Sequence, residues 1–213
     1  MMPPFKSAFK QTIHIWIALV LLCAAVWFYL INHSKAEGYL SLVPYHSKPL
    51  DIFFTCFTYL GDGIVILLLA VVAFLRKYKW PGIAIIVSYA LSGLLSQVIK
   101  YFFPSPRPAV FFREMGQSFY EIPGVTLMKS MASFPSGHTA SAFALFSVLV
   151  LMNPRSKWNV LWLILAVAVG YSRIYLGNHF LIDVLCGAVI GVLSGMATII
   201  LLPIFTKSKS SVL

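Results

Sequence analysis

The stretch VLWLILAVAVGYSRIYLGNHFLIDVLCGAVIGVLSGMATIILL (residues 160–202) consists of two long apolar runs separated by a short polar segment. Each run is long enough to form a helix that crosses a bilayer, and a tight turn would join the two helices. Arg173, His179 and Asp183 lie at this turn. A charged residue within a membrane helix costs about 2.5–3.5 kcal/mol on insertion scales, so these side chains indicate a function.

The rest of the chain has the same membrane character, because 60% of its 213 residues are hydrophobic and 10% are charged. We predict six spanning helices, which cover residues 13–31, 51–75, 81–103, 136–152, 159–176 and 180–203. The first run continues to Ile31 without a small-x-small cleavage site, which favours a helix over a signal peptide. The predicted fold is an all-α polytopic membrane protein with a single domain over residues 1–213.

The net charge of +10 follows the connections between these helices. Nine basic residues fall on the termini and on two alternate connections, namely Lys6, Lys10, Arg76, Lys77, Lys79, Arg155, Lys157, Lys207 and Lys209. The positive-inside rule places these segments in the cytoplasm, so we predict cytoplasmic termini and outer loops at 32–50, 104–135 and 177–179. Because the charge follows membrane topology, it does not indicate a nucleic-acid partner.

His179 and Asp183 are spaced for an interaction on one helix face. If the sixth helix begins by Gly177 or Asn178, the two side chains are one turn apart. Asp183 would then accept a hydrogen bond from one ring nitrogen and leave the other free to attack an electrophile. Arg173 can point at the same place. The alternative is an arginine that snorkels to the interface beside a structural His–Asp pair.

A second polar group opens the fourth predicted helix, in SFPSGHTASAFALF (residues 133–146). Ser136 is a good N-cap, and Gly137 allows a ligand to approach the backbone. The free amides of Ser136, Gly137 and His138 would form a phosphate seat at the positive end of the helix dipole. His138 adds a proton donor there, although a lone histidine is more often a capping or interfacial residue.

A third group lies in KYFFPSPRP (residues 100–108), at the outer end of the third predicted helix. Lys100 and Arg107 would each be ordinary charges alone, but together they give a point charge and a planar fork that suit phosphate oxygens. The predicted topology places all three groups at the outer face. Their coincidence favours one phosphate-binding site.

These residues resemble the signature of the type 2 phosphatidic acid phosphatase (PAP2) superfamily of integral membrane lipid phosphatases. The signature reads Lys-x6-Arg-Pro, Pro-Ser-Gly-His and Ser-Arg-x5-His-x3-Asp. Residues 100–108, 135–138 and 172–183 match it without departure. The signature covers residues 100–183, which form the predicted site-bearing part of the domain.

The resemblance implies that His179 is a nucleophile that forms a phosphohistidine, oriented by Asp183, and that His138 protonates the leaving oxygen. It also implies that the phosphoryl oxygens are held by Lys100, Arg107, Ser136, Gly137 and Arg173. No metal or other cofactor is predicted, because three cations face the phosphate and the sequence has no cluster of carboxylates to hold Mg²⁺.

The implied activity is hydrolysis of a lipid phosphate or diphosphate in the cell envelope. Undecaprenyl diphosphate, which we favour slightly, phosphatidylglycerophosphate, phosphatidic acid and lipid A phosphate stay open, because the motifs contact only the shared phosphate. A small six-helix chain is typical of a bacterial inner membrane, with the site facing the periplasm or outside. The alternatives are a phosphoryl transferase between lipids and a non-catalytic lipid-binding or transport protein. The sequence does not indicate an oligomeric state.

Three other features predict structure around the site. Asp62, within the second predicted helix, should face the bundle interior and either pair with a site cation or form a structural hydrogen bond. The aromatic-rich part of the second outer loop, residues 109–133, is either an interfacial cover over the site or a mere connector. As a cover, it would place aromatic side chains in the headgroup layer, namely Phe111, Phe112, Phe119 and Tyr120. Small residues at every fourth position predict close helix packing, at Gly187, Gly191, Gly195, Ser88, Ser92 and Ser96.

Overall fold

The computed structural model describes residues 4–123 and 130–207, and within these ranges it is helical, with one isolated β-bridge between Ser105 and Ala132. Residues 124–129 of the predicted outer loop and Lys209 of the basic C-terminus lie outside the described residues. The helices are α1 (Phe5–Gln11), α2 (Ile13–Asn32), α3 (Lys35–Leu42), α4 (Lys48–Phe57), the 3-10 helix η1 (Thr58–Gly61), α5 (Gly63–Leu75), α6 (Lys79–Phe102), α7 (Pro108–Glu114), α8 (Gly137–Met152), α9 (Asn159–Tyr175) and α10 (Leu181–Lys207). The all-α prediction is confirmed.

Each of the six predicted membrane segments contains helix in the structure, and α1, α3 and α7 lie outside these segments. In the described ranges, α2, α6 and α10 are long and apolar enough to cross a membrane, and α4 to α5 makes a fourth span if the bent pair is taken as one. The helices α8 and α9 are apolar but shorter, with 16 and 17 residues. The protein is thus an integral membrane protein, and the count of six spans stays a prediction.

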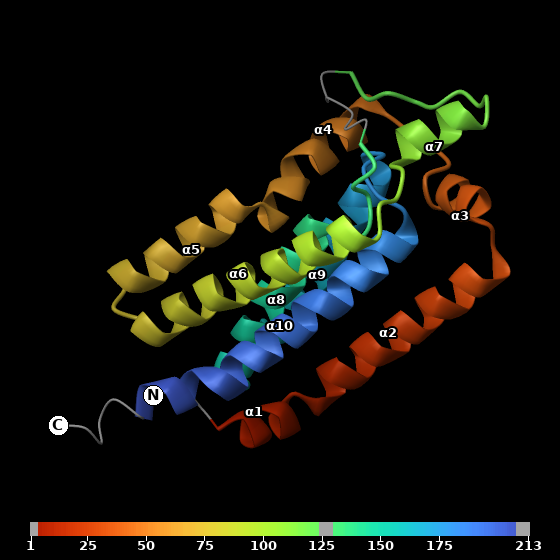
Figure 1. The fold of residues 1–213 in the computed structure, drawn as a ribbon. Coiled ribbons are helices and arrows are strands. Elements are labelled where there is room, and N and C mark those ends of the chain that lie inside the picture. Colours follow the sequence, from red (N-terminus) through yellow and green to blue (C-terminus); the bar gives the residue numbers. More distant parts are fainter. Residues whose placement is uncertain (1–3, 124–129, 208–213) are drawn as a thin grey trace.

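The second predicted helix is not continuous, so the expectation of one helix over residues 51–75 is wrong. The chain bends by 53° between η1 and α5, a break that is visible in Figure 1. Asp62 has extended backbone angles at this point, and its side chain accepts a hydrogen bond from the amide of Ile64 at 2.8 Å. An aspartate between two glycines favours such a cap over a continuing helix.

Helix α8 lies at the centre of the bundle, between α6, α9 and α10, and most of its residues are buried. The glycine stripe of α10 packs on it, as the sequence predicts. A Cβ on Gly187 would lie 2.5 Å from the carbonyl oxygen of Ser136, and one on Gly195 would lie 2.5 Å from Cβ of Ser147. The predicted serine stripe of α6 is also buried. Small side chains therefore let these helices approach closely.

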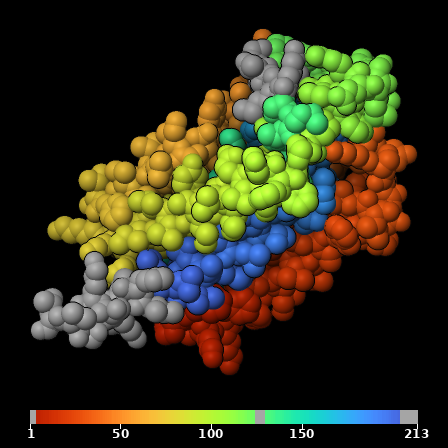
Figure 2. Space-filling view, in the orientation of Figure 1, coloured from red at the N-terminus to blue at the C-terminus, as the bar shows by residue number. Residues whose placement is uncertain are grey.

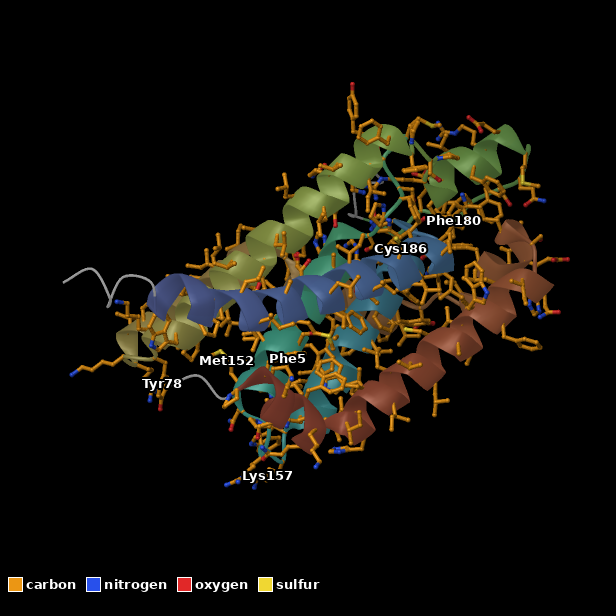
Figure 3. The ribbon with its side chains drawn as sticks, turned by 60° about the horizontal axis from the view of Figure 1, so that its bottom comes forward. Phe5, Tyr78, Met152, Lys157, Phe180 and Cys186 are labelled. Atoms are coloured by element: carbon orange, nitrogen blue, oxygen red, sulfur yellow. The ribbon has the colours of Figure 1, made fainter. Side chains whose placement is uncertain are left out.

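The two ends of the bundle differ. Helix α1, the connection between α5 and α6, and the last turns of α10 lie at one end, whereas α3, α4 and α7 lie at the other (Figure 1). In Figure 3, Tyr78 and Lys157 are far from Phe180, which precedes α10. Figure 2 shows the surface of α10 as a band between α6 and α2.

The end with α3 and α7 is closed by an aromatic cluster that was not predicted. Tyr39 of α3 contacts Phe112 and Phe119, with centroid distances of 5.4 and 5.8 Å, and the Phe180 ring contacts Tyr39 at 5.9 Å. The expectation that Phe112 rests in the headgroup layer is wrong, because its side chain is buried in this cluster. Apolar rings gain more free energy by packing together than at a wet interface.

Candidate active site

The predicted site residues converge at the end of the bundle that carries α3 and α7. Hydrogen bonds join the three segments: Lys100 Nζ to the carbonyl oxygen of Pro135 at 2.7 Å, Arg107 Nη1 to that of Asn178 at 2.9 Å, and the amide of Ser136 to the carbonyl oxygen of Asp183 at 3.0 Å. Segments far apart in sequence thus form one site.

His179 and Asp183 face each other, but not on one helix. The condition that α10 begins by Gly177 or Asn178 is not met, because α10 begins at Leu181. The chain turns at Gly177, whose φ of +66° favours glycine, and the Nδ1 of His179 then lies 3.4 Å from Oδ2 of Asp183. This spacing is at the long end of a hydrogen bond, and Nδ1 has no well-aligned hydrogen-bond partner within the described residues.

Asp183 is held by two further donors. The Oγ of Ser133 donates to Oδ2 at 2.6 Å, and the amide of Phe180 donates to the same oxygen at 2.9 Å. The Asp183 carboxylate is fully buried, and these bonds hold Oδ2 and offset part of its desolvation, whereas Oδ1 has no hydrogen-bond partner within the described residues. Ser133 was not predicted, and only its position three residues before Ser136 hints at a role.

The imidazole of His179 lies in the connection before α10 and is 3% exposed. Burial lowers the pKa of His179 below its usual value, and the neighbouring Asp183 only partly opposes this effect. The ring is therefore neutral at neutral pH. With Nδ1 directed at the carboxylate, Nε2 is the nitrogen with a free lone pair, which is the state that a nucleophile needs.

His138 lies at the start of α8 and has an acidic neighbour. Its Nε2 is 3.6 Å from Oδ2 of Asp62, and each side chain is 29% exposed. Of the two roles predicted for Asp62, the structure shows the structural hydrogen bond, to the amide of Ile64, and it also places the carboxylate beside His138. The flanking Gly61 and Gly63 were the signal that could have shown a break at this position.

Three cations surround the histidines. Lys100 donates to the carbonyl oxygens of Ala132 and Pro135, and Arg107 donates to Ser130 and Asn178. The Nη1 of Arg173 donates to Oγ1 of Thr58 at 2.7 Å, which was not predicted. The hydrogen bonds of these groups go to neutral oxygens, and the three cations outnumber the two nearby carboxylates, Asp62 and Asp183.

The Nε of Arg173 is buried and has no hydrogen-bond partner within the described ranges. A buried guanidinium with an unsatisfied donor is costly unless an anion enters the site. This orphan donor and the excess of cations suit the oxygens of a phosphate.

The start of α8 differs from the prediction in two respects. The amide of Ser136 is not free, because it donates to the carbonyl oxygen of Asp183. The Oγ of Ser136 accepts from the hydroxyl of Thr139 at 2.8 Å and from its amide at 3.4 Å, and Ser136 is fully buried. Ser136 therefore caps the helix, and its predicted contact with a phosphoryl oxygen stays a prediction. A Cβ on Gly137 would meet open space, which leaves the amide side of the helix start accessible.

In the part of the chain that the structure describes, no group of three His, Cys, Asp or Glu side chains is placed to hold a metal ion. The carboxylates near the histidines are Asp62 and Asp183, and each pairs with a different ring.

Comparison with known proteins assigns the chain to a family. The family model of the PAP2 superfamily matches residues 81–207, which include all three motif segments. The chain belongs to the PAP2 superfamily. Its resemblance to the superfamily signature is therefore confirmed.

Among relatives, undecaprenyl-diphosphatase of Sulfolobus acidocaldarius is 28% identical over 164 residues, which cover 77% of this chain and 71% of that protein. The crystal structure of Aquifex aeolicus LpxE has a TM-score of 0.64 and 32% identity, and covers 77% of this chain and 93% of the other. The crystal structure of a PAP2-type phosphatidylglycerolphosphate phosphatase from Bacillus subtilis also has a TM-score of 0.64 and is 26% identical. The match covers 89% of this chain and 94% of the other. Another curated relative matches over a shorter stretch, and the chain spans 30% of its length.

Proposed function

We propose that this PAP2 superfamily member is a membrane phosphatase that hydrolyses a lipid phosphate or diphosphate through a phosphohistidine. The observation that carries the proposal is the pairing of His179 with a buried, doubly held carboxylate inside a cluster of three cations. A transporter or a lipid-binding protein would use the cations but has no need for a buried neutral histidine with one oriented nitrogen.

The chemistry divides into two displacements. The Nε2 lone pair of His179 attacks phosphorus, the bond to the leaving oxygen breaks, and His138 gives that oxygen a proton. A water molecule then attacks the phosphohistidine and passes a proton to His138, which releases inorganic phosphate and restores both histidines. Lys100, Arg107 and Arg173 stabilise the charge on the phosphoryl oxygens in both steps.

The substrate proposal is supported by what the relatives are named for. One is an undecaprenyl-diphosphatase and one a phosphatidylglycerolphosphate phosphatase. Lipid A 1-phosphatase of Rhizobium johnstonii is also similar in sequence. The motif residues contact the phosphate group, which all these lipids have in common, so the motifs do not select one lipid. We favour a lipid carrier diphosphate, and contacts with the lipid chain would provide the selectivity.

The proposed arrangement has six spans over residues 1–213, cytoplasmic termini and an outer-facing site in a bacterial inner membrane. Two observations support it. The basic connection between α5 and α6 lies at the end of the bundle opposite α3 and α7 (Figure 1). Lys157, in the basic connection between α8 and α9, also lies far from Phe180 at the site (Figure 3). The positive-inside rule then directs the catalytic end outward.

The test is phosphate release by detergent-purified protein from phosphatidic acid, phosphatidylglycerophosphate, undecaprenyl diphosphate and lipid A, with and without chelator. We expect release from at least one lipid in the presence of chelator. His179→Ala should abolish turnover, and His138→Ala should lower it by about 10²–10⁴-fold, the usual contribution of a general acid. His14→Ala, an exposed histidine on α2, is the control and should behave like wild type. Normal turnover by His179→Ala would refute the mechanism.

A further inference from the structure

We propose that Asp62 positions His138, through a carboxylate contact that keeps one ring nitrogen protonated and aims the other at the leaving oxygen. The segment LGDG (residues 60–63) would then be a fourth part of the active site, outside the three signature motifs. This inference rests on the proposed function, because it gives His138 the role of proton donor.

The two oxygens of Asp62 have different partners. Oδ1 accepts from the amide of Ile64 at 2.8 Å and so caps α5, whereas Oδ2 lies 3.6 Å from Nε2 of His138. The cap fixes the carboxylate on a rigid helix start. Oδ2 is therefore held at a constant place beside the ring, as an orienting group requires.

The flanking glycines allow this approach. A Cβ on Gly61 would lie 2.7 Å from the carbonyl oxygen of His138 and 2.6 Å from Cγ1 of Val169, and a Cβ on Gly63 would collide with the hydroxyl of Tyr89. The break in the second span therefore packs directly on the start of α8, on α9 and on α6. At Gly61 a side chain would meet the backbone of His138, so glycine allows the segment before Asp62 to lie this close to the start of α8.

Charge explains why His138 needs this neighbour. The charged groups that face it are Arg173 of α9, Arg107 before α7 and Asp62. Asp62 is the carboxylate among them, with Oδ2 3.6 Å from the ring. A general acid must carry its proton when substrate binds, so the negative charge of Asp62 offsets the phosphate-binding arginines at this ring.

The contact also assigns the nitrogens of His138. Nε2–H points to Asp62, and Nδ1–H gives its proton to the leaving oxygen as the bond to phosphorus breaks. The ring is then neutral, with Nε2–H still on Asp62 and a lone pair on Nδ1 that accepts the proton of the attacking water. Asp62 itself keeps its charge throughout, as an orienting carboxylate does in other acid–base pairs.

Asp62→Asn and Asp62→Ser separate this role from helix capping, because Asn and Ser are both good N-caps and neither carries a charge. With dioctanoyl phosphatidic acid, both variants should lose about 10–100-fold in kcat with little change in KM. With p-nitrophenyl phosphate, whose leaving group needs little protonation, the loss should be several-fold smaller. The alkaline limb of the pH–rate profile on the lipid should move to lower pH in both variants.

Asp51→Asn is the matched control. Asp51 is a buried carboxylate of the preceding helix that accepts from the hydroxyls of Tyr175 and Tyr120, away from His138. This variant should keep the wild-type pH profile and the wild-type ratio between the two substrates. Wild-type kcat and pH profile in both Asp62 variants would mean that Asp62 only caps α5, and an equal loss on both substrates with an unchanged profile would also overturn the proposal.

A readout without turnover keeps this inference separate from the proposed function. In protein labelled with ¹³C-histidine, the NMR titration of His138, assigned with His138→Ala, should move down by about one pH unit in Asp62→Asn. An unmoved titration would overturn the contact whatever the activity. If the proposed function alone is wrong, the titration still moves, but wild type and His138→Ala release phosphate from the lipids equally or not at all.

Discussion

Burial of His179 has a consequence for stability as well as for catalysis. The folded chain keeps this ring neutral because burial lowers its pKa, whereas in the unfolded chain the ring titrates near 6.5. Below pH 6.5 the unfolded state therefore binds a proton at position 179 that the folded state does not bind. The contribution of His179 to the free energy of unfolding is therefore full above pH 6.5, and it falls as the pH is lowered toward the pKa of the folded state.

We expect the protein in detergent to lose stability between pH 7.5 and pH 5.5, with position 179 contributing about 1.4 kcal/mol per pH unit below 6.5. His179→Gln lacks the proton and should show a weaker dependence of Tm on pH over this range. Thermal melts followed by intrinsic fluorescence measure both. Parallel curves for the two proteins would contradict the burial of a neutral imidazole.

Sequence spacing identified the charged residues of the site but not their partners. His179 and Asp183 could be paired from their spacing, whereas Ser133 lies fifty residues from the carboxylate to which it donates, and Thr58 is farther still from Arg173. A single serine or threonine carries no local signal of such a contact. These partnerships come from helix packing, which a motif does not encode.

At the scale of elements, hydropathy located the helices well. The bounds of α2, α6, α8 and α9 lie within two residues of the predicted ranges. The break before α5 was missed because a hydropathy window averages over the two glycines and the aspartate that cause it. Helix α3 was missed too, although Ser34 and Glu37 form a capping box that is readable in the sequence.

The packing of α10 on α8 makes a prediction for one glycine. A Cβ on Gly191 would collide with the carbonyl oxygen of Ala140, and a backbone atom in the middle of a helix cannot move aside cheaply. We expect Gly191→Ala to destabilise the protein by about 1–3 kcal/mol, the usual cost of overpacking, and to lower Tm in detergent.

Gly93→Ala on α6 is the matched control, since a Cβ there meets nothing within 4 Å. Alanine is a better helix former than glycine by about 1 kcal/mol, so this variant should be as stable as wild type or more so. Equal Tm values for the two variants would mean that the α8–α10 contact is not tight.

At the scale of the whole molecule, the basic connections and the candidate site lie at opposite ends of the bundle. The connection with Lys157 is at one end, and Phe180, next to His179, is at the other (Figure 3). A lipid phosphate lies in the headgroup layer, so a site at the rim of a bundle reaches it without drawing the phosphate into hydrocarbon. The same geometry means that membrane orientation alone decides which leaflet supplies the substrate.

That orientation can be measured with single cysteines. After replacement of Cys23, Cys56 and Cys186, a new cysteine is placed at Glu114 of α7 or at Lys157 before α9, both of which are exposed. A membrane-impermeant maleimide added to intact cells should label Glu114→Cys, because α7 lies at the catalytic end. Lys157→Cys should react only after the membrane is opened, since the positive-inside rule predicts a cytoplasmic position for its connection. The reverse pattern would place the site on the cytoplasmic leaflet, and the enzyme would then have to act on lipid phosphates before they cross the membrane.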